Sequence, residues 1–243
     1  MARGSDGLNI LKEVESSNNY AMALVKDGKA RSGEGFLAMK QTGGKGRRGR
    51  KWVSEEGMNV LLTLVQDMKW MQVTDQFQLS VATALGVYDM VLEFIGINIF
   101  LKWPNDLYID DRKAGGILIE NVISGSKWQW AVIGIGLNVN QEKFDDLSLS
   151  ATSIKKATGK DYELIEVAEK LKGCVERRIK ELQSQNYPDM LKLYNDHLYK
   201  RNCVVKFRKG NIVFESVVKG VSPSGELLTA DRNLKYDEVE WIR

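Results

Sequence analysis

The sequence has few of the residue types that build metal clusters, disulfide frameworks and nucleophilic catalytic groups. Its 243 residues include two cysteines, Cys174 and Cys203, and one histidine, His197. The cysteines are far apart and have no Cys-x-x-Cys spacing, which excludes a structural zinc site and a disulfide scaffold. So few candidates leave no Ser/His/Asp or Cys/His arrangement to assemble, and we expect no protein nucleophile. His197 is predicted to be a helix-surface or packing residue.

Long apolar segments and a one-sided charge balance are also missing. No run of about 18 apolar residues occurs, and residues 1–7 have no apolar centre of the kind found in signal peptides. Lys and Arg number 35 against 32 Asp and Glu, a net charge of +3, so the chain as a whole is not built to coat a nucleic acid. We therefore expect a protein of the reducing cytoplasm without a membrane partner.

The positive charge is instead concentrated in residues 41–52, Gln-Thr-Gly-Gly-Lys-Gly-Arg-Arg-Gly-Arg-Lys-Trp, which we call the glycine loop. Five of the nine residues from 43 to 51 are cationic, a density that would repel itself unless an anion were bound part of the time. Its four glycines can take positive φ and turn backbone N–H groups inward, so that a phosphate can approach closely. The loop predicts a polyanion as a partner.

Three known glycine patterns do not account for this loop. The spacing Gly44-x-Gly46-x-x-Gly49 fits a dinucleotide fingerprint, but no apolar helix follows it. A P-loop would need Lys-Ser or Lys-Thr where Arg50 and Lys51 stand, and a kinase loop would need valine at position 51 and a later Asp-Phe-Gly. From the loop alone, a solvated basic segment and a nucleic-acid patch both remain open.

Hydrophobic periodicity divides most of the chain into strands and helices. Strands are predicted over 8–11, 35–40, 58–65, 97–102, 107–109, 113–120 and 128–133. Helices are predicted over 20–25 with a cap in 15–19, over 74–94 with a cap at Thr74 and Asp75, over 164–185 and over 187–199. Residues 144–159 are predicted to be a loop that leads to a helix. The glycine loop therefore joins two neighbouring strands, and the helix over 74–94 is expected to lie under a sheet.

The sequence pattern changes near the end of the chain. From residue 201 the pattern changes to short β segments, 203–207, 213–218, 226–229 and 239–242, separated by Gly, Asn, Ser and Pro turns. These hairpins are enough for a small barrel. We therefore divide the chain into residues 1–200 and 201–243.

Polar and glycine-rich clusters follow several predicted strands, where chemistry tends to gather. Lys102 ends an apolar strand, where a buried ammonium needs an anion but an edge-strand lysine would face water. Asp106 could cap a turn, or meet magnesium or an amine. Lys113 precedes Ala-Gly-Gly, which leaves room for a ligand, and Asn138 follows Gly-Ile-Gly-Leu, where a tight turn is the simpler interpretation. Without a protein nucleophile, such cations suit adenylation or another phosphate displacement by a second substrate.

An ordered set of four stretches resembles the biotin protein ligases. The stretches are Ser16-Ser17-Asn18, Gln41 with the glycine loop, Lys102-Trp-Pro-Asn-Asp106 with Lys113-Ala-Gly-Gly-Ile-Leu-Ile-Glu120, and Gly134-Ile-Gly-Leu-Asn138-Val-Asn. The resemblance covers essentially the whole chain. It implies an α/β (α+β) catalytic domain over residues 1–200, a mixed sheet flanked by helices as in class II synthetases and biotin ligases. Residues 201–243 would form a small SH3-like β-barrel.

The resemblance also implies a reaction and its participants. Biotin would attack ATP to give biotinyl-5′-AMP and pyrophosphate, and a lysine of a biotin carboxyl carrier protein domain would then take the biotin. Magnesium is the expected metal, with Asp106 as a ligand. Some members of the family carry an amino-terminal DNA-binding domain, whereas about fifteen residues precede the Ser-Ser-Asn motif here. We therefore predict a monofunctional ligase that binds no DNA, as a monomer or homodimer.

Residue roles follow from the same resemblance. The expected biotin-binding residues are Ser16, Ser17, Asn18, Gln41, Gly44, Arg47, Lys113, Gly115 and Gly116. The expected ATP- and adenylate-binding residues are Arg47, Arg48, Arg50, Trp52, Lys102, Asn105 and Asn138. Arg47, Lys113 and Asp106 are expected to be catalytic, with the Lys113 charge offsetting the negative charge of the transition state.

The sequence departs from the family pattern at two positions, and two other functions compete. Lys45 stands where the family often has Arg, and Ser17 replaces a frequent Thr. A lipoate or octanoate ligase or transferase has a similar catalytic fold, but generally lacks the full glycine loop after Gln41. A nucleic-acid-binding module that uses the loop and the barrel is the other alternative.

Overall fold

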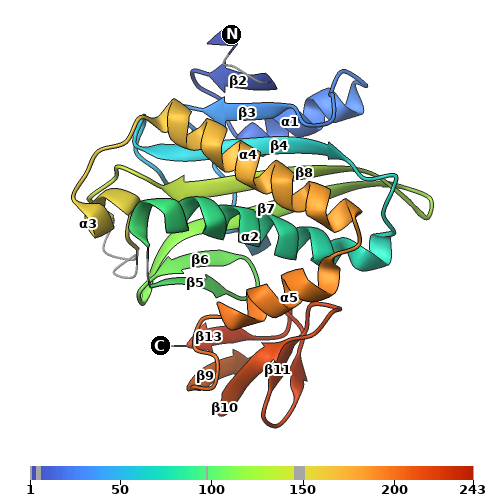
Figure 1. Cartoon of the computed structure of the whole chain (residues 1–243), viewed down its shortest axis with the longest axis vertical. Helices are drawn as coiled ribbons and strands as arrows, with labels where there is room; N and C mark the ends of the chain where they lie inside the picture. Colours follow the sequence, from blue (N-terminus) through green and yellow to red (C-terminus); the bar gives the residue numbers. More distant parts are fainter. Residues whose placement is uncertain (1, 4–6, 97, 145–150, 243) are drawn as a thin grey trace.

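The computed structural model describes residues 2–3, 7–96, 98–144 and 151–242. Ile97, in the strand predicted over 97–102, and residues 145–150, in the loop predicted over 144–159, lie outside these ranges. So do residues 1 and 4–6 of the amino terminus. The described residues form an eight-stranded sheet and a five-stranded sheet, with helices packed on them (Figure 1).

The eight-stranded sheet contains the strands predicted before residue 140. Its order is β1-β2-β3-β4-β8-β7-β6-β5. The strands are β1 (Ala2–Arg3), β2 (Leu8–Leu11), β3 (Gly35–Ala38), β4 (Asn59–Asp67), β5 (Ile99–Lys102), β6 (Asp106–Ile109), β7 (Arg112–Ser124) and β8 (Lys127–Asn138). The sheet is mixed, as predicted, because β2 and β3 are parallel and the other neighbours are antiparallel. The glycine loop connects β3 and β4, which are adjacent.

Helices cover both faces of this sheet. Helix α1 (Ser17–Lys26) connects β2 to β3 and packs with Phe36 and Val132 on one face. Helices α2 (Gln76–Ile95) and α4 (Leu164–Gln183) lie side by side across the other face (Figure 1). Gly86 permits this close packing, because a Cβ there would lie 2.6 Å from Val175 Cα. The remaining described α-helices are α3 (Ile154–Thr158) and α5 (Tyr187–Asp196).

Helix α2 is apolar because it is enclosed by the rest of the protein. The segment Val73–Ile95 is long and apolar enough to cross a membrane, since its most apolar 18 residues have a mean hydropathy of 1.3. However, 61% of that 18-residue stretch is buried inside the protein. The burial identifies α2 as a core helix. Its predicted cap is wrong in one respect, since Asp75 is at the N-cap position but its side chain makes no capping hydrogen bond. A 3₁₀ turn at Val73–Asp75 leads into the helix instead.

The carboxyl-terminal strands form the second sheet, in the order β12-β11-β10-β9-β13. They are β9 (Val204–Lys209), β10 (Ile212–Val221), β11 (Leu227–Thr229), β12 (Asn233–Leu234) and β13 (Glu240–Ile242). Their pairings are all antiparallel, and within the described ranges β12 and β13 have one neighbour each. The predicted change to short β segments is confirmed, whereas the predicted closure into a barrel is not, because the sheet is open.

The five-stranded sheet packs against the rest of the chain below helix α5 (Figure 1). Trp103 Nε1 donates to the carbonyl oxygen of Gly225 at 2.9 Å, and the Tyr187 hydroxyl donates to that of Pro223 at 2.9 Å. Phe207 and other residues of this sheet belong to the same buried apolar cluster as α2 and α4. This packing brings residues 236–241 to the glycine loop.

Candidate active site

A cavity of about 290 Å³ lies between the glycine loop, the start of α1, strands β4 to β8 and residues 236–241. It gathers most of the side chains that the sequence singled out. The predicted site residues that line it are Ser16, Ser17, Asn18, Gln41, Arg47, Arg48, Arg50, Trp52, Lys102, Asn105, Asp106, Lys113 and Gly116. Gly44, Gly115 and Asn138 are not among its lining residues.

Neutral polar groups at the start of α1 form part of the cavity wall. Ser16 caps the helix, since its hydroxyl accepts a hydrogen bond from the Asn19 N–H at 3.4 Å. The backbone N–H and hydroxyl of Ser17 both donate to Gln41 Oε1, at 2.7 and 3.0 Å. Ser16, Ser17 and Asn18 are all buried. A fixed set of hydrogen-bonding groups of this kind can recognise an uncharged polar ring.

The glycine loop folds back on itself beside the cavity, and several of its residues line it. Gly46 N donates to Arg50 O at 2.7 Å, and Trp52 N donates to Gly44 O at 2.9 Å. A Cβ on Gly44 would lie 2.5 Å from Trp52 O, so the loop needs glycine there. Arg48 takes a left-handed conformation, with φ 56°, which is uncommon for a residue with a side chain. The loop thus presents its arginines from a tight turn.

These arginines contact the carboxyl-terminal segment. Arg47 lies over the ring of Tyr236, 4.4 Å from the centroid, and its Nη2 is 3.7 Å from Asp237 Oδ1. Arg48 Nη2 donates to Tyr236 O, and Arg50 Nη2 is 3.0 Å from Glu240 Oε1. Burial lowers the pKa of Arg47, while the neighbouring Tyr236 and Asp237 act in the opposite direction. The Arg47 guanidinium stays charged, since the ordinary pKa of an arginine side chain is far above neutral pH.

A lysine and a carboxylate meet over the middle of the cavity. Lys113 Nζ is 2.6 Å from Asp106 Oδ1 and 5.6 Å from the centroid of the Trp52 ring. The indole lies against the two glycine positions of the neighbouring strands: a Cβ would lie 3.2 Å from Trp52 Cζ3 at Gly116 and 2.5 Å from Cε2 at Gly136. The glycines therefore leave space for a flat ring above the sheet.

Lys102 is surrounded by aromatic rings. Its Nζ donates to the Tyr108 hydroxyl at 2.9 Å and lies 4.6, 5.7 and 5.3 Å from the ring centroids of Tyr108, Tyr199 and Trp241. Aromatic faces stabilise an ammonium group, and Lys102 lines the cavity. Of the two interpretations of Lys102, this position favours a cation that faces a ligand.

Three predicted ligand-binding residues are placed away from the cavity wall. Asn138 is 5% exposed, and its side-chain amide donates to Thr152 O at 2.9 Å. Gly115 lies within strand β7 beside Gly136, and Gly44 lies beneath the backbone of Trp52. Asn105 lines the cavity, but its side-chain amide is used within the protein, on Ile117 O at 2.8 Å.

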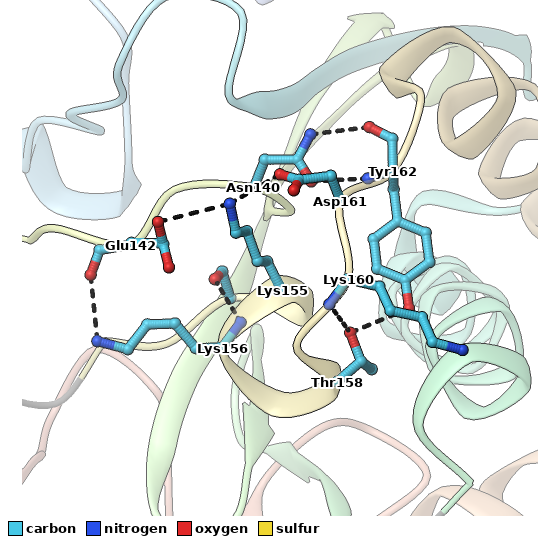
Figure 2. A network of polar contacts seen from close by, with 9 residues as sticks. Asn140, Glu142, Lys155, Lys156, Thr158, Lys160, Asp161 and Tyr162 are labelled. Atoms are coloured by element: carbon cyan, nitrogen blue, oxygen red, sulfur yellow. Dashed lines mark hydrogen bonds and ion pairs between the residues drawn. The ribbon is translucent and has the colours of Figure 1, made fainter.

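The polar residues that follow Asn138 anchor the end of β8 to α3 and the segment after it, as Figure 2 shows. Asn140 exchanges two hydrogen bonds with the backbone of Tyr162, at 2.8 and 3.0 Å. Lys155 Nζ is 2.8 Å from Asp161 Oδ1 (Figure 2). Asn140, the second asparagine of the Asn-Val-Asn sequence, therefore has a structural role.

The predicted magnesium ligand is a single carboxylate. Within the described parts of the chain, no group of three or more His, Cys, Asp or Glu side chains could hold a metal ion. Mg²⁺ does not need such a group, because it often uses one or two carboxylates together with substrate phosphates and water. Asp106 fits that role, in competition with the ammonium of Lys113.

The carboxyl-terminal segment contributes cavity residues that the sequence patterns did not predict. Tyr236, Val239, Glu240 and Trp241 line the cavity. Trp52 Nε1 and Trp241 Nε1 are buried and have no hydrogen-bond partner among the described residues. The available signal was charge: acids at 237, 238 and 240 complement the basic glycine loop.

The fold and this cavity are those of an acyl-activating ligase, and the comparisons agree. The chain belongs to the biotin/lipoate A/B protein ligase family, whose family model matches residues 11–138. It is 30% identical over 224 residues to the bifunctional ligase/repressor BirA of Bacillus subtilis, covering 90% of this chain and 68% of that protein. A biotin–[acetyl-CoA-carboxylase] ligase of Paracoccus denitrificans is 36% identical over 133 residues, 54% of this chain and 53% of that protein.

A solved structure supports the same assignment. The biotin protein ligase from Aquifex aeolicus in complex with biotin and ATP matches with a TM-score of 0.79 and 28% identity, covering 97% of this chain and 95% of that one. The resemblance to biotin protein ligases is thereby confirmed for the family and for the mixed α/β fold.

Proposed function

We propose that the chain activates biotin with ATP and transfers it to a lysine of a biotin carboxyl carrier protein domain. First, a carboxylate oxygen of biotin attacks the α-phosphorus of ATP, the bond to the bridging oxygen of the β-phosphate breaks, and biotinyl-5′-AMP and pyrophosphate form. Then the lysine amine attacks the carbonyl carbon of this anhydride, loses a proton and releases AMP. The enzyme is a biotin–[biotin carboxyl-carrier protein] ligase.

One observation carries this proposal: neutral hydrogen-bonding groups and several cations line one and the same cavity. Ser17 and Gln41 suit the uncharged ureido ring of biotin, whereas Arg47, Lys102 and Lys113 suit a carboxylate and phosphates. The substrates named for the A. aeolicus and P. denitrificans proteins support the same choice.

The residue roles are proposed from position and chemistry. Ser16, Ser17, Asn18 and Gln41 form the biotin-ring end, and Gly116 leaves room for the Trp52 indole in the same cavity. Arg47, Arg48, Arg50, Trp52, Lys102 and Asn105, which line the cavity, serve ATP and the adenylate. Lys113 lies where the carboxylate meets the α-phosphate, so its charge offsets the charge that grows on the phosphate oxygens.

Magnesium is part of the proposal as a group that neutralises phosphate charge. Asp106 would hold the ion together with oxygens of the nucleotide. Lys113 Nζ lies 2.6 Å from Asp106 Oδ1. The Asp106 carboxylate would therefore contact both the lysine and the magnesium ion. The residues present therefore fit a metal bound jointly by protein and nucleotide.

The remaining assignments extend this proposal. We place the enzyme in the cytoplasm, as a monomer or homodimer without DNA or membrane partners. Residues 1–200 would be the catalytic domain, and the open sheet of residues 201–243 would be an incomplete version of an SH3-like barrel. The acceptor lysine would approach the anhydride from the open side of the cavity.

The test uses the purified chain with ATP, magnesium and one of three acids, biotin, lipoate or octanoate, followed by mass spectrometry. We expect selective formation of biotinyl-AMP and transfer to a carrier-domain lysine. Adenylate from lipoate or octanoate alone would assign the chain to the other branch of the family. No adenylate, together with salt-sensitive and ATP-independent binding to nucleic acid, would favour the nucleic-acid module.

A further inference from the structure

Thr63 lies beneath the biotin-ring end of the cavity and does not line it. The residue is on β4, paired across the sheet with Phe36 on β3 and Gly134 on β8, and its side chain is 0% exposed. The missing side chain at Gly134 leaves the space that the Asn18 amide occupies, since a Cβ there would lie 2.8 Å from Asn18 Cγ. The Thr63 hydroxyl therefore faces the first turn of α1.

This hydroxyl is the centre of a chain of hydrogen bonds. Thr63 Oγ1 is 2.8 Å from Ser17 Oγ and 2.8 Å from Asn18 Oδ1. On one side the Ser17 hydroxyl donates to Gln41 Oε1 at 3.0 Å. On the other side Asn18 Nδ2 donates to Glu120 Oε2 at 2.9 Å. Three residues at the ring-binding end thus depend on one hydroxyl behind them.

Counting protons shows what Thr63 can do that an apolar side chain cannot. The Thr63 hydroxyl has one proton and faces two acceptors, Ser17 Oγ and Asn18 Oδ1. Neither neighbour donates to Thr63, because the Ser17 hydroxyl donates to Gln41 Oε1 and Asn18 Nδ2 donates to Glu120 Oε2. If a ligand carbonyl takes the Ser17 proton, Gln41 Oε1 still keeps the Ser17 backbone N–H at 2.7 Å. Thr63 donates its one proton to either Ser17 Oγ or Asn18 Oδ1, so it supports the groups beside the ligand in a way that an apolar side chain cannot.

We propose that Thr63 is a positioning residue for biotin, acting through the Ser17 hydroxyl and the Asn18 amide. This inference rests on the proposed function, because it takes the ring at this end of the cavity to be the ureido ring of biotin. The carboxylate and phosphate groups are bound by other residues, so the effect of Thr63 is confined to biotin.

The experiment compares Thr63→Val, which keeps the shape but removes the hydroxyl, with Thr63→Ser, which keeps the hydroxyl. Pyrophosphate release during biotinyl-AMP formation gives KM for biotin and for ATP. Thr63→Val should raise KM for biotin about tenfold, the loss of roughly one buried hydrogen bond, with KM for ATP unchanged. Thr63→Ser should restore most of the affinity.

Thr83→Val is the matched control, because Thr83 is also 0% exposed but its hydroxyl donates to Leu79 O within α2. It should leave both KM values unchanged. Thr63→Ala provides a second hydroxyl-free variant if the valine variant folds poorly, and thermal unfolding reports the folded state of each.

An unchanged KM for biotin in folded Thr63→Val or Thr63→Ala would overturn the inference. So would an equal rise in KM for ATP, or a rise in KM for biotin in Thr83→Val, since either would indicate a general structural effect. If the wild-type protein forms no biotinyl-AMP, the proposed function itself fails, and that outcome is distinct because it precedes any comparison of variants.

Discussion

Replacing Glu240 by glutamine is expected to tighten ATP binding, although the change breaks an ion pair. Glu240 Oε1 is 3.0 Å from Arg50 Nη2, at the rim of the cavity, and the two side chains are 47% and 73% exposed. A pair this exposed stabilises the protein by about 0–1 kcal/mol, so its loss changes the folded state little. The same carboxylate, however, repels any phosphate that approaches Arg50.

The size of the effect follows from Coulomb's law. At about 7 Å in water, two unit charges interact with about 0.6 kcal/mol, which corresponds to a factor of about three in affinity. A triphosphate places more than one charge near the arginine, so about three- to tenfold tighter binding is expected at low salt. Near 1 M salt the screening length is about 3 Å, and the difference should vanish.

The assay is calorimetric titration of a non-hydrolysable ATP analogue at about 0.05 M and about 1 M salt. Glu238→Gln is the matched control, because Glu238 pairs with Lys209 at 3.1 Å and does not line the cavity. It should change affinity less than Glu240→Gln. Weaker binding in Glu240→Gln would refute the reasoning and would show that Glu240 mainly orders the glycine loop.

Three further outcomes are expected. Lys113→Ala should slow pyrophosphate release about 10²-fold or more, measured in single turnovers, because its charge acts in the transition state; an unaltered rate would remove that role. Gly134→Ala should displace the Asn18 amide, since the new methyl would lie 2.8 Å from Asn18 Cγ, and weaken biotin binding with little effect on ATP in paired titrations. Burial lowers the pKa of His197, so the folded state favours the neutral imidazole. The contribution of His197 to the free energy of unfolding should therefore be fully present above about pH 6.5 and decrease as the pH falls below that value. His197→Phe should flatten this fall in thermal unfolding between about pH 7.5 and 5.5.

Local patterns predicted the parts of the protein that depend on neighbouring residues. The strands on either side of the glycine loop follow from periodicity, and the Ser16 cap follows from capping chemistry. His197 was expected on a helix surface or in packing, and its ring stacks on Tyr88 with centroids 4.2 Å apart. The ordered motifs also contain most of the polar side chains that line the cavity, with Asn138 as an exception.

Contacts between distant segments could not be predicted in this way. Thr63 reads as one more strand residue, and its role depends on the register that sets it opposite Gly134 and under α1. The sequence pattern places Trp241 in a short β segment of the predicted barrel. In the structure the second sheet packs against the first, and the Trp241 ring centroid lies 5.3 Å from Lys102 Nζ. Asn138 was expected at the ligand because of its motif, whereas its amide is used by Thr152 O. Composition carries no information on such pairings.

Strand β13 links the second sheet to the chemistry of the cavity. It is an edge strand held by its pairing with β9, in which Glu240 lies opposite Arg208. A ligand that competes with Glu240 for Arg50 must loosen one of the contacts that fix β13, and by thermodynamic linkage a looser β13 must favour that ligand equally. Because the ion pair is exposed, this coupling through Glu240 is limited to about 1 kcal/mol, a factor of about five in affinity. A stronger effect of the second sheet on ATP binding would therefore have to act through other contacts, such as that of Tyr236 with Arg47 or that of Trp241 with Lys102.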